Sequence, residues 1–140
     1  MSGPSEPASA SILIVDGDIV SRHVIADYLR HCAYAVVEAA TTDEAHTALL
    51  EPTLSIDVIL CDVSALGSRS GFELATWVRQ HRPELEVRLA AGVDVAAQTA
   101  AELCESGPHL KRPYEPEAVI DYIKRLRGSR SSTAFRTEAK

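Results

Sequence analysis

The chain lacks any long hydrophobic run. Its apolar stretches are far shorter than the roughly 20 residues that a membrane-spanning helix needs. The N-terminal segment MSGPSEPASAS has no basic stretch followed by an apolar one, as a secretory signal would. We therefore expect a cytoplasmic protein that has no membrane partner.

Cysteine is scarce, and acidic charge outweighs basic charge. The three cysteines, Cys32, Cys61 and Cys104, are widely separated and form no CxxC pair. This pattern predicts buried thiols rather than a disulfide framework or a zinc site. The net charge of −6 argues against nucleic acid as a partner. The basic stretch KRLRGSR is interpreted as the solvated end of a helix, where cations favour the negative pole of the helix dipole.

What the chain does contain is a regular alternation of short apolar runs and helical patterns. Apolar runs typical of buried strands occupy 12–15, 35–37, 58–61, 87–90 and, more weakly, 109–110. Helical spacing of apolar residues follows over 19–31, 41–51, from 72 to just before Pro83, 95–104, and from 116 onward. Strand then helix, five times over, predicts an α/β fold with helices on both faces of a parallel sheet.

Five strands in this rhythm suit the flavodoxin-like doubly wound arrangement (βα)5, with a five-stranded parallel sheet in the order 2-1-3-4-5. We expect one domain over 11–127. The flanking segments 1–10 and 128–140 carry no apolar period and are predicted to be disordered tails.

Acidic residues stand where strands 1 and 3 end. Asp16 follows ILIV and Asp62 follows VILC, and the two strands should be neighbours, so the carboxylates should face one crevice. Such a pair repels unless a cation lies between them, and Mg²⁺ prefers oxygen ligands of this kind. The backbone carbonyl of Ser64, the side chain of Asp18 and water could complete the shell. Taken singly, each aspartate could equally be an ordinary helix-start or loop carboxylate.

A third segment, HLKRPYEP, brings Lys111 and Arg112 to the same edge. Together with ILIVDGD, DVILCDV and KRPYEPEAV, in this order and spacing, it makes the chain resemble a response-regulator receiver domain of two-component signalling. The resemblance covers about residues 11 to 127.

The resemblance implies specific roles. Asp62 would accept a phosphoryl group from a histidine kinase or phosphotransfer protein, and Asp16 would hold Mg²⁺. Arg112 stands where receivers have a lysine, and His109 at the aromatic switch position. The output would be binding of a downstream protein through the face of helix 4, strand 5 and helix 5, and the fold allows a homodimer. Such a protein is not an enzyme beyond self-dephosphorylation.

The chain also departs from the receiver pattern. Gly17 replaces the second adjacent acid, so Mg²⁺ binding should weaken unless Asp18 substitutes. The switch hydroxyl falls on Ala90, which cannot donate, and Leu66 replaces the usual loop proline. The stretch LAAG resembles the FAT GUY subfamily, in which the hydroxyl moves one residue on, but that position here is Ala91, so only Gly92 matches.

Three function classes follow from these residues. The favoured one is a phosphoacceptor receiver that signals by protein–protein interaction. The alternative is a phosphorylation-independent pseudo-receiver that acts as a docking module, which Gly17, Ala90 and Arg112 all make plausible. A flavin carrier on the same fold is disfavoured, because the acidic DGDIVS loop would repel a flavin phosphate.

Overall fold

The computed structural model describes residues 10–105 and 115–139, with side chains as far as Gly128. Its elements are β1 (Ser11–Val15), α1 (Ile19–His31), β2 (Ala35–Ala39), α2 (Thr42–Leu50), β3 (Val58–Asp62), α3 (Gly71–His81), β4 (Glu86–Ala90), α4 (Val93–Glu105) and α5 (Pro116–Ala139). The strands form one parallel sheet in the order β2-β1-β3-β4. The α/β class and the first four positions of the predicted order are therefore confirmed. The fifth strand, expected at 109–110, lies outside the described residues.

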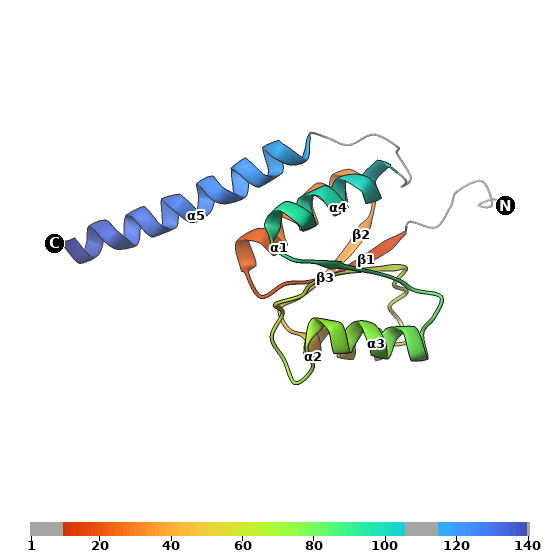
Figure 1. Cartoon of the computed structure of the whole chain (residues 1–140). Helices are drawn as coiled ribbons and strands as arrows, with labels where there is room; N and C mark the ends of the chain where they lie inside the picture. The colour runs from red at the N-terminus through yellow and green to blue at the C-terminus, as the bar shows by residue number, and fades with distance from the viewer. Residues whose placement is uncertain (1–9, 106–114, 140) are drawn as a thin grey trace.

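The sheet separates two hydrophobic layers (Figure 1). Alternate residues of β1 and β3, such as Ile12 and Leu60, face the layer formed with α1, α4 and α5. The intervening residues, such as Leu13 and Cys61, face the layer formed with α2 and α3. Burial on both faces explains why these strands read as continuous apolar runs. Because side chains alternate along a strand, Cys61 points to the opposite face of the sheet from its neighbours Leu60 and Asp62.

Local caps fix where the central helices begin. Thr41 is the N-cap of α2 and accepts the backbone N–H of Glu44 at 3.0 Å, which confirms the predicted start. Helix α2 then stops at Leu50, before Pro52. Ser70 and Glu73 form a complete capping box at the start of α3, in which each side chain accepts the other residue's backbone N–H.

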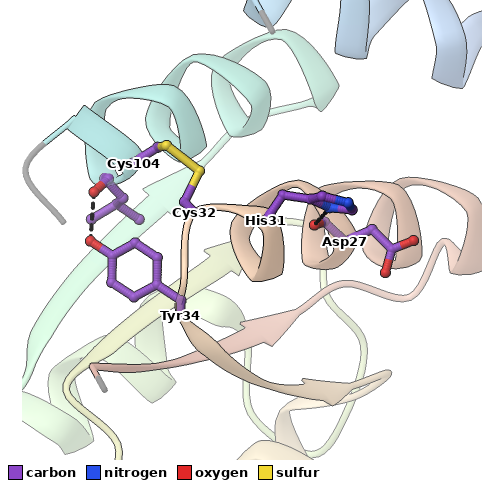
Figure 2. The surroundings of a disulfide bond; sticks show 6 residues. Asp27, His31, Cys32, Tyr34 and Cys104 are labelled. Carbon is purple, nitrogen blue, oxygen red and sulfur yellow. Dashed lines mark hydrogen bonds between the residues drawn. A yellow bond between two sulfur atoms is a disulfide. The ribbon is translucent and has the colours of Figure 1, made fainter. Parts of the chain in front are cut away.

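A disulfide joins Cys32 to Cys104, which corrects the prediction that all three cysteines are thiols. Their Cα atoms are 5.4 Å apart although 72 residues separate them in the chain. Figure 2 shows Cys32 at the end of α1 meeting Cys104 on α4, beside the Tyr34 hydroxyl, which donates to the Leu103 carbonyl. Odd parity and wide spacing gave no sign of this bond, because it depends on α1 and α4 packing on the same face. Cys61 is a free, buried thiol, as predicted.

Helix α5 is longer than the sequence predicted. It continues to Ala139, whereas a disordered tail was expected over 128–140. After Pro116, at the start of the helix, the segment contains no further proline, and its only glycine is Gly128, so nothing in it forces the helix to end. Val119 and Ile123 bury the first half of α5 against the α1 and α4 layer. The second half extends past the body of the domain in Figure 1.

Within residues 10–105 and 115–139, no helix combines the length and the apolar character that crossing a membrane requires.

Candidate functional site

Asp16 and Asp62 occupy equivalent positions on neighbouring strands. In the register of β1 and β3, Val15 pairs with Cys61, and each aspartate is the next residue along its chain. The residues that precede them, Val15 and Cys61, face the α2 and α3 layer, and both aspartates are half-buried. The structure therefore brings together at one edge of the sheet the two carboxylates that the sequence predicted would meet there.

The electrostatics of Asp16 reflect this crowding. Burial raises the pKa of Asp16, and the negative charges of Asp62 and Asp18 raise it further. The backbone N–H of Asp18 donates to Asp16 Oδ1 at 2.9 Å and offsets part of this effect, but the net direction is upward. An ionised carboxylate at this position is therefore short of positive charge, and a cation bound there would relieve the repulsion.

The backbone of Asp16 is held on both sides. Its N–H donates to the carbonyl of Ala39 at 3.0 Å, which continues the β1 and β2 ladder by one residue. Its carbonyl accepts a hydrogen bond from Arg22 Nη1 at 2.9 Å, while Arg22 Nε is paired with Glu38. These bonds keep the strand extended up to the point where the carboxylate leaves the sheet.

Asp18 is engaged differently. It is the N-cap of α1: its carboxylate accepts the N–H of Val20 at 3.2 Å and the hydroxyl of Ser21 at 2.9 Å. The guanidinium of Arg127, on α5, donates to the same carboxylate. Burial raises the pKa of Asp18, but these hydrogen bonds outweigh it, so the net direction is downward. Coordination of a metal by Asp18 would require one of these donors to be displaced.

Gly17 leaves space beside this cluster. A Cβ atom built on Gly17 would meet only the carbonyl oxygen of Ala40, at an ordinary 3.6 Å. The second acid that receivers usually carry is therefore absent from the sequence but is not excluded by the fold.

Ala90 lies directly beside Asp62. The two residues are register partners in β3 and β4, and the N–H of Val63 donates to the Ala90 carbonyl at 3.0 Å. Ala90 is buried, whereas the following residue, Ala91, is exposed. Gly92 has a φ of 103°, a conformation that favours glycine, so the turn out of β4 depends on it. The position that receivers use for a hydroxyl thus carries a methyl group.

The loop after Asp62 turns back on the aspartate. The N–H of Ser64 donates to Asp62 Oδ1 at 3.2 Å, and the N–H of Ala65 donates to the Asp62 carbonyl at 3.0 Å. Ser64 therefore lies next to the predicted phosphoacceptor, where its carbonyl was expected to serve as a ligand. Burial raises the pKa of the neighbouring Cys61 thiol to about 12, and the negative charges of Asp62 and Asp16 add to this effect.

Gly71, the first residue of α3, supports Asp62 from behind. A Cβ atom there would lie 3.0 Å from the Asp62 carbonyl oxygen, 3.2 Å from Val63 Cα and 3.3 Å from Cys61 Sγ. Only glycine lets α3 approach the end of β3 so closely. The sequence gave no indication of Arg127, which is 109 residues from Asp18.

The remaining predicted site residues cannot be placed. Arg112, Lys111 and His109 fall in 106–114, outside the described residues. Across the part of the chain that the structure does describe, no group of three or more His, Cys, Asp or Glu side chains is arranged to hold a metal ion. A metal bound by the described residues would therefore have fewer than three such side chains as ligands.

The donor set nevertheless fits Mg²⁺. This ion is commonly held by one or two carboxylates, with water and substrate phosphate oxygens completing its octahedral shell. Asp16 and Asp62 can supply two hard oxygen ligands, and a bound cation would oppose the burial and the Asp62 charge that raise the pKa of Asp16. A two-carboxylate site of modest affinity is what these residues can form.

Comparison with known proteins identifies the family and the fold of this chain. The model of the response regulator receiver domain family matches residues 12–124. The chain belongs to that family. The transcriptional regulatory protein ResD of Bacillus subtilis is 27% identical over 124 residues, which cover 89% of this chain and 50% of ResD. The two-component response regulator-like protein PRR37 of Oryza sativa subsp. indica is 37% identical over 70 residues, or 50% of this chain and 9% of that protein.

Solved structures agree on the fold of this receiver domain. A CheY-like receiver domain protein from Methanospirillum hungatei matches with a TM-score of 0.57 and 21% identity, covering 90% of this chain and 99% of its own. A receiver domain protein from Clostridium thermocellum matches with a TM-score of 0.56 and 22% identity, covering 84% and 97%. The receiver chain thus spans nearly all of these single domains but half or less of the curated relatives.

Proposed function

We propose that this receiver domain accepts a phosphoryl group on Asp62 from a histidine kinase or phosphotransfer protein. The observation that supports this most is the position of Asp62 at the carboxyl end of β3, coupled electrostatically to Asp16 at the end of β1. Ligands of doubly wound folds bind at this edge. Receiver domains generally bind Mg²⁺ in an acidic pocket and interact with kinases and downstream targets, and membership of this family supports assigning that role to the acidic edge.

The chemistry requires one oxygen nucleophile. A carboxylate oxygen of Asp62 attacks phosphorus in line, the bond from phosphorus to the donor nitrogen breaks, and the donor leaves with that electron pair. Bound Mg²⁺ would neutralise charge on the phosphoryl oxygens. Asp16 would help to hold the metal, and Arg112 would supply a further positive charge in the role that the family gives its lysine. Water later hydrolyses the acyl phosphate, so the protein is a phosphoacceptor rather than a catalyst with a separate substrate.

Partner surfaces adjoin the acidic edge. A groove of about 560 Å³ runs between α1 and α5, lined by His23, Val24, Asp27, His31, Tyr122 and Leu126. A second groove of about 400 Å³ continues it toward Ile19, at the first turn of α1. The phosphodonor protein docks along this path, next to Asp16. The downstream target binds on the side of the domain where α4 and α5 lie.

The alternative is a pseudo-receiver that docks partners without phosphorylation. Ala90 favours it, because a phosphoryl group on Asp62 would find a methyl group at its register partner instead of a hydroxyl donor. The exposed Ala91 offers none either. The pseudo-receiver would bind its partners without accepting a phosphoryl group, whereas phosphorylation of the active receiver would shift the conformation of its binding face.

A direct test separates the two. The protein is incubated with Mg²⁺ and acetyl phosphate, and intact mass is measured; beryllofluoride with thermal unfolding gives a second readout. We expect one phosphoryl adduct on the wild type and none on Asp62→Asn. Asp121→Asn, which removes an exposed carboxylate on α5, is the matched control and should be modified like the wild type.

Two results would count against the proposal. The absence of an adduct on the wild type, with no stabilisation by beryllofluoride, would favour the docking module. An adduct that persists in Asp62→Asn would place the phosphoryl group on another residue.

A further inference from the structure

Arg127 brings a fixed positive charge to the acidic edge from a distant part of the chain. Its guanidinium donates to the Asp18 carboxylate and to the Ser21 hydroxyl, so it contacts two residues of the first turn of α1 at once. Ser21 is buried, and Asp18 is half-buried. Arginine suits such a contact because its planar fork can serve two acceptors together.

The body of the domain holds this arginine in place. Ile123 and Val119, about one and two turns earlier on α5, are buried in the layer that α5 shares with α1 and α4. In the same layer, the Cys32–Cys104 disulfide joins α4 to the end of α1. The helix that carries Arg127 is thus packed, one turn before this residue, against α1 and α4, which the disulfide joins.

The charge of Arg127 extends beyond Asp18. It lowers the pKa of Asp18 directly, and it also acts against the upward shift of the Asp16 pKa. Arg127 therefore supplies, from within the chain, part of the positive charge that a bound metal would supply. A neighbouring arginine on the same helix does not: Arg125 lies over the ring of Tyr122, 5.8 Å from its centroid.

We propose that Arg127 is an internal counter-ion that competes with divalent cations for the acidic edge. This inference rests on the proposed function, since it assumes that Mg²⁺ binds at Asp16 and Asp62. When α5 is packed against α1, the guanidinium of Arg127 is hydrogen-bonded to the Asp18 carboxylate. Its positive charge then lowers the affinity of the site for Mg²⁺. When Arg127 leaves Asp18, the carboxylate becomes available to the metal directly or through water, so docking of α5 regulates phosphorylation of Asp62.

The experiment measures Mg²⁺ affinity by isothermal titration calorimetry, with the full chain and without any phosphodonor. Arg127→Gln should bind Mg²⁺ roughly two- to tenfold more tightly than the wild type, as expected for removing one cation at close range in a partly solvated site. Arg125→Gln makes the same charge change two residues away and should leave the affinity within about twofold of the wild type.

A metal-free measurement tests the contact itself. Thermal unfolding midpoints are compared for the wild type, Asp18→Asn, Arg127→Gln and the double variant, without Mg²⁺. Asparagine caps a helix about as well as aspartate, so Asp18→Asn removes the charge while α1 keeps its cap. If the pair interacts, the two single changes are non-additive by about 1–4 °C.

The outcomes distinguish this inference from the proposed function. If the changes in unfolding midpoint of the two single variants add up to that of the double variant, Arg127 and Asp18 are not coupled, which overturns the inference. Equal Mg²⁺ affinity of the wild type and Arg127→Gln, with measurable binding in both, overturns the competition but leaves the metal site. Absence of Mg²⁺ binding in every variant refutes the metal site, and the competition falls with it.

Discussion

Asp62 and Ala90 are register partners at the ends of β3 and β4, so the predicted phosphoacceptor lies beside a buried methyl group. In a receiver, a side chain in this place is near enough to contact a phosphoryl group on the aspartate. Whether the domain responds to phosphorylation therefore depends on what Ala90 and its neighbours can donate.

Restoring a hydroxyl at position 90 should strengthen this response. Ala90→Ser is expected to cost about 1–3 kcal/mol in the unmodified protein, because the buried hydroxyl lacks a dedicated partner. Beryllofluoride with Mg²⁺ should supply that partner, so the rise in unfolding temperature on its addition should be larger than in the wild type. Ala91→Ser, at the exposed neighbouring position, tests the FAT GUY-like arrangement. If neither variant gains stabilisation, a hydroxyl at these positions does not reach the bound group.

Gly17→Asp should tighten Mg²⁺ binding by about tenfold, because it adds a third carboxylate where the fold leaves room. Gly17→Asn has the same size without the charge and should bind Mg²⁺ like the wild type. Calorimetric titration of the three proteins checks this. Unchanged affinity in Gly17→Asp would indicate that Asp18 already fills the role or that the acidic edge does not bind the ion.

Asp16→Asn should stabilise the metal-free protein at neutral pH. The folded-state pKa of Asp16 is raised above its ordinary value of 3.8, mainly by burial and then by Asp62, so the ionised group opposes folding. Its contribution is most favourable below pH 3.8 and is lost as the pH rises through the folded-state pKa. The gain in Asp16→Asn should thus be present at pH 7, less than about 1 kcal/mol given solvent screening, and vanish at low pH.

Denaturant unfolding of Asp16→Asn at several pH values measures this dependence. Asp121→Asn, an exposed change on α5, is the control. The same Asp16→Asn protein should bind Mg²⁺ more weakly, so Mg²⁺ would stabilise it less than the wild type. A pH-independent gain would exclude the ionisation of Asp16 as its cause.

The disulfide determines how many thiols per chain should react with a thiol reagent. Without reductant, one thiol per chain, Cys61, should react after unfolding, and three should react once the protein is reduced. In the folded protein Cys61 should resist alkylation near neutral pH, because burial and the nearby aspartates raise its pKa to about 12. Removing the cross-link with Cys32→Ser and Cys104→Ser should lower the unfolding free energy by about 2–4 kcal/mol.

Cys61→Ala serves as the control for this pair. It should keep the reductant dependence of stability, and it should show no reactive thiol after unfolding without reductant. Three reactive thiols in the oxidised, unfolded wild type would mean that Cys32 and Cys104 are not bonded.

Gly71→Ala should disturb the acidic edge from behind. The added methyl group would lie 3.0 Å from the Asp62 carbonyl oxygen, so α3 or the end of β3 must shift, at a cost of about 1–3 kcal/mol. Phosphorylation by acetyl phosphate should slow as well. Gly128→Ala is the matched control: nothing lies within 4 Å of its Cβ position, and alanine there should stabilise α5 by about 0.5–1 kcal/mol. Equal stability of the two variants would refute the tight packing at Gly71.

The sequence determined the features that depend on neighbouring residues. Apolar runs and helical spacing predicted four of the strands and all five helices, and Thr41 with Glu44 marked the start of α2. The approach of Asp16 and Asp62 could also be predicted, because parallel strands end at a common edge of the sheet and each aspartate directly follows its strand.

Only the tertiary structure decided which distant side chains meet. Cys32 and Cys104 are joined because α1 and α4 share one face of the sheet, and Arg127 contacts Asp18 because α5 packs on that same face. Such contacts depend on the face to which each helix is attached and on its direction there. Hydrophobic burial over the whole molecule decides where each helix packs. The residues that meet as a result carry no local sequence pattern that announces the contact.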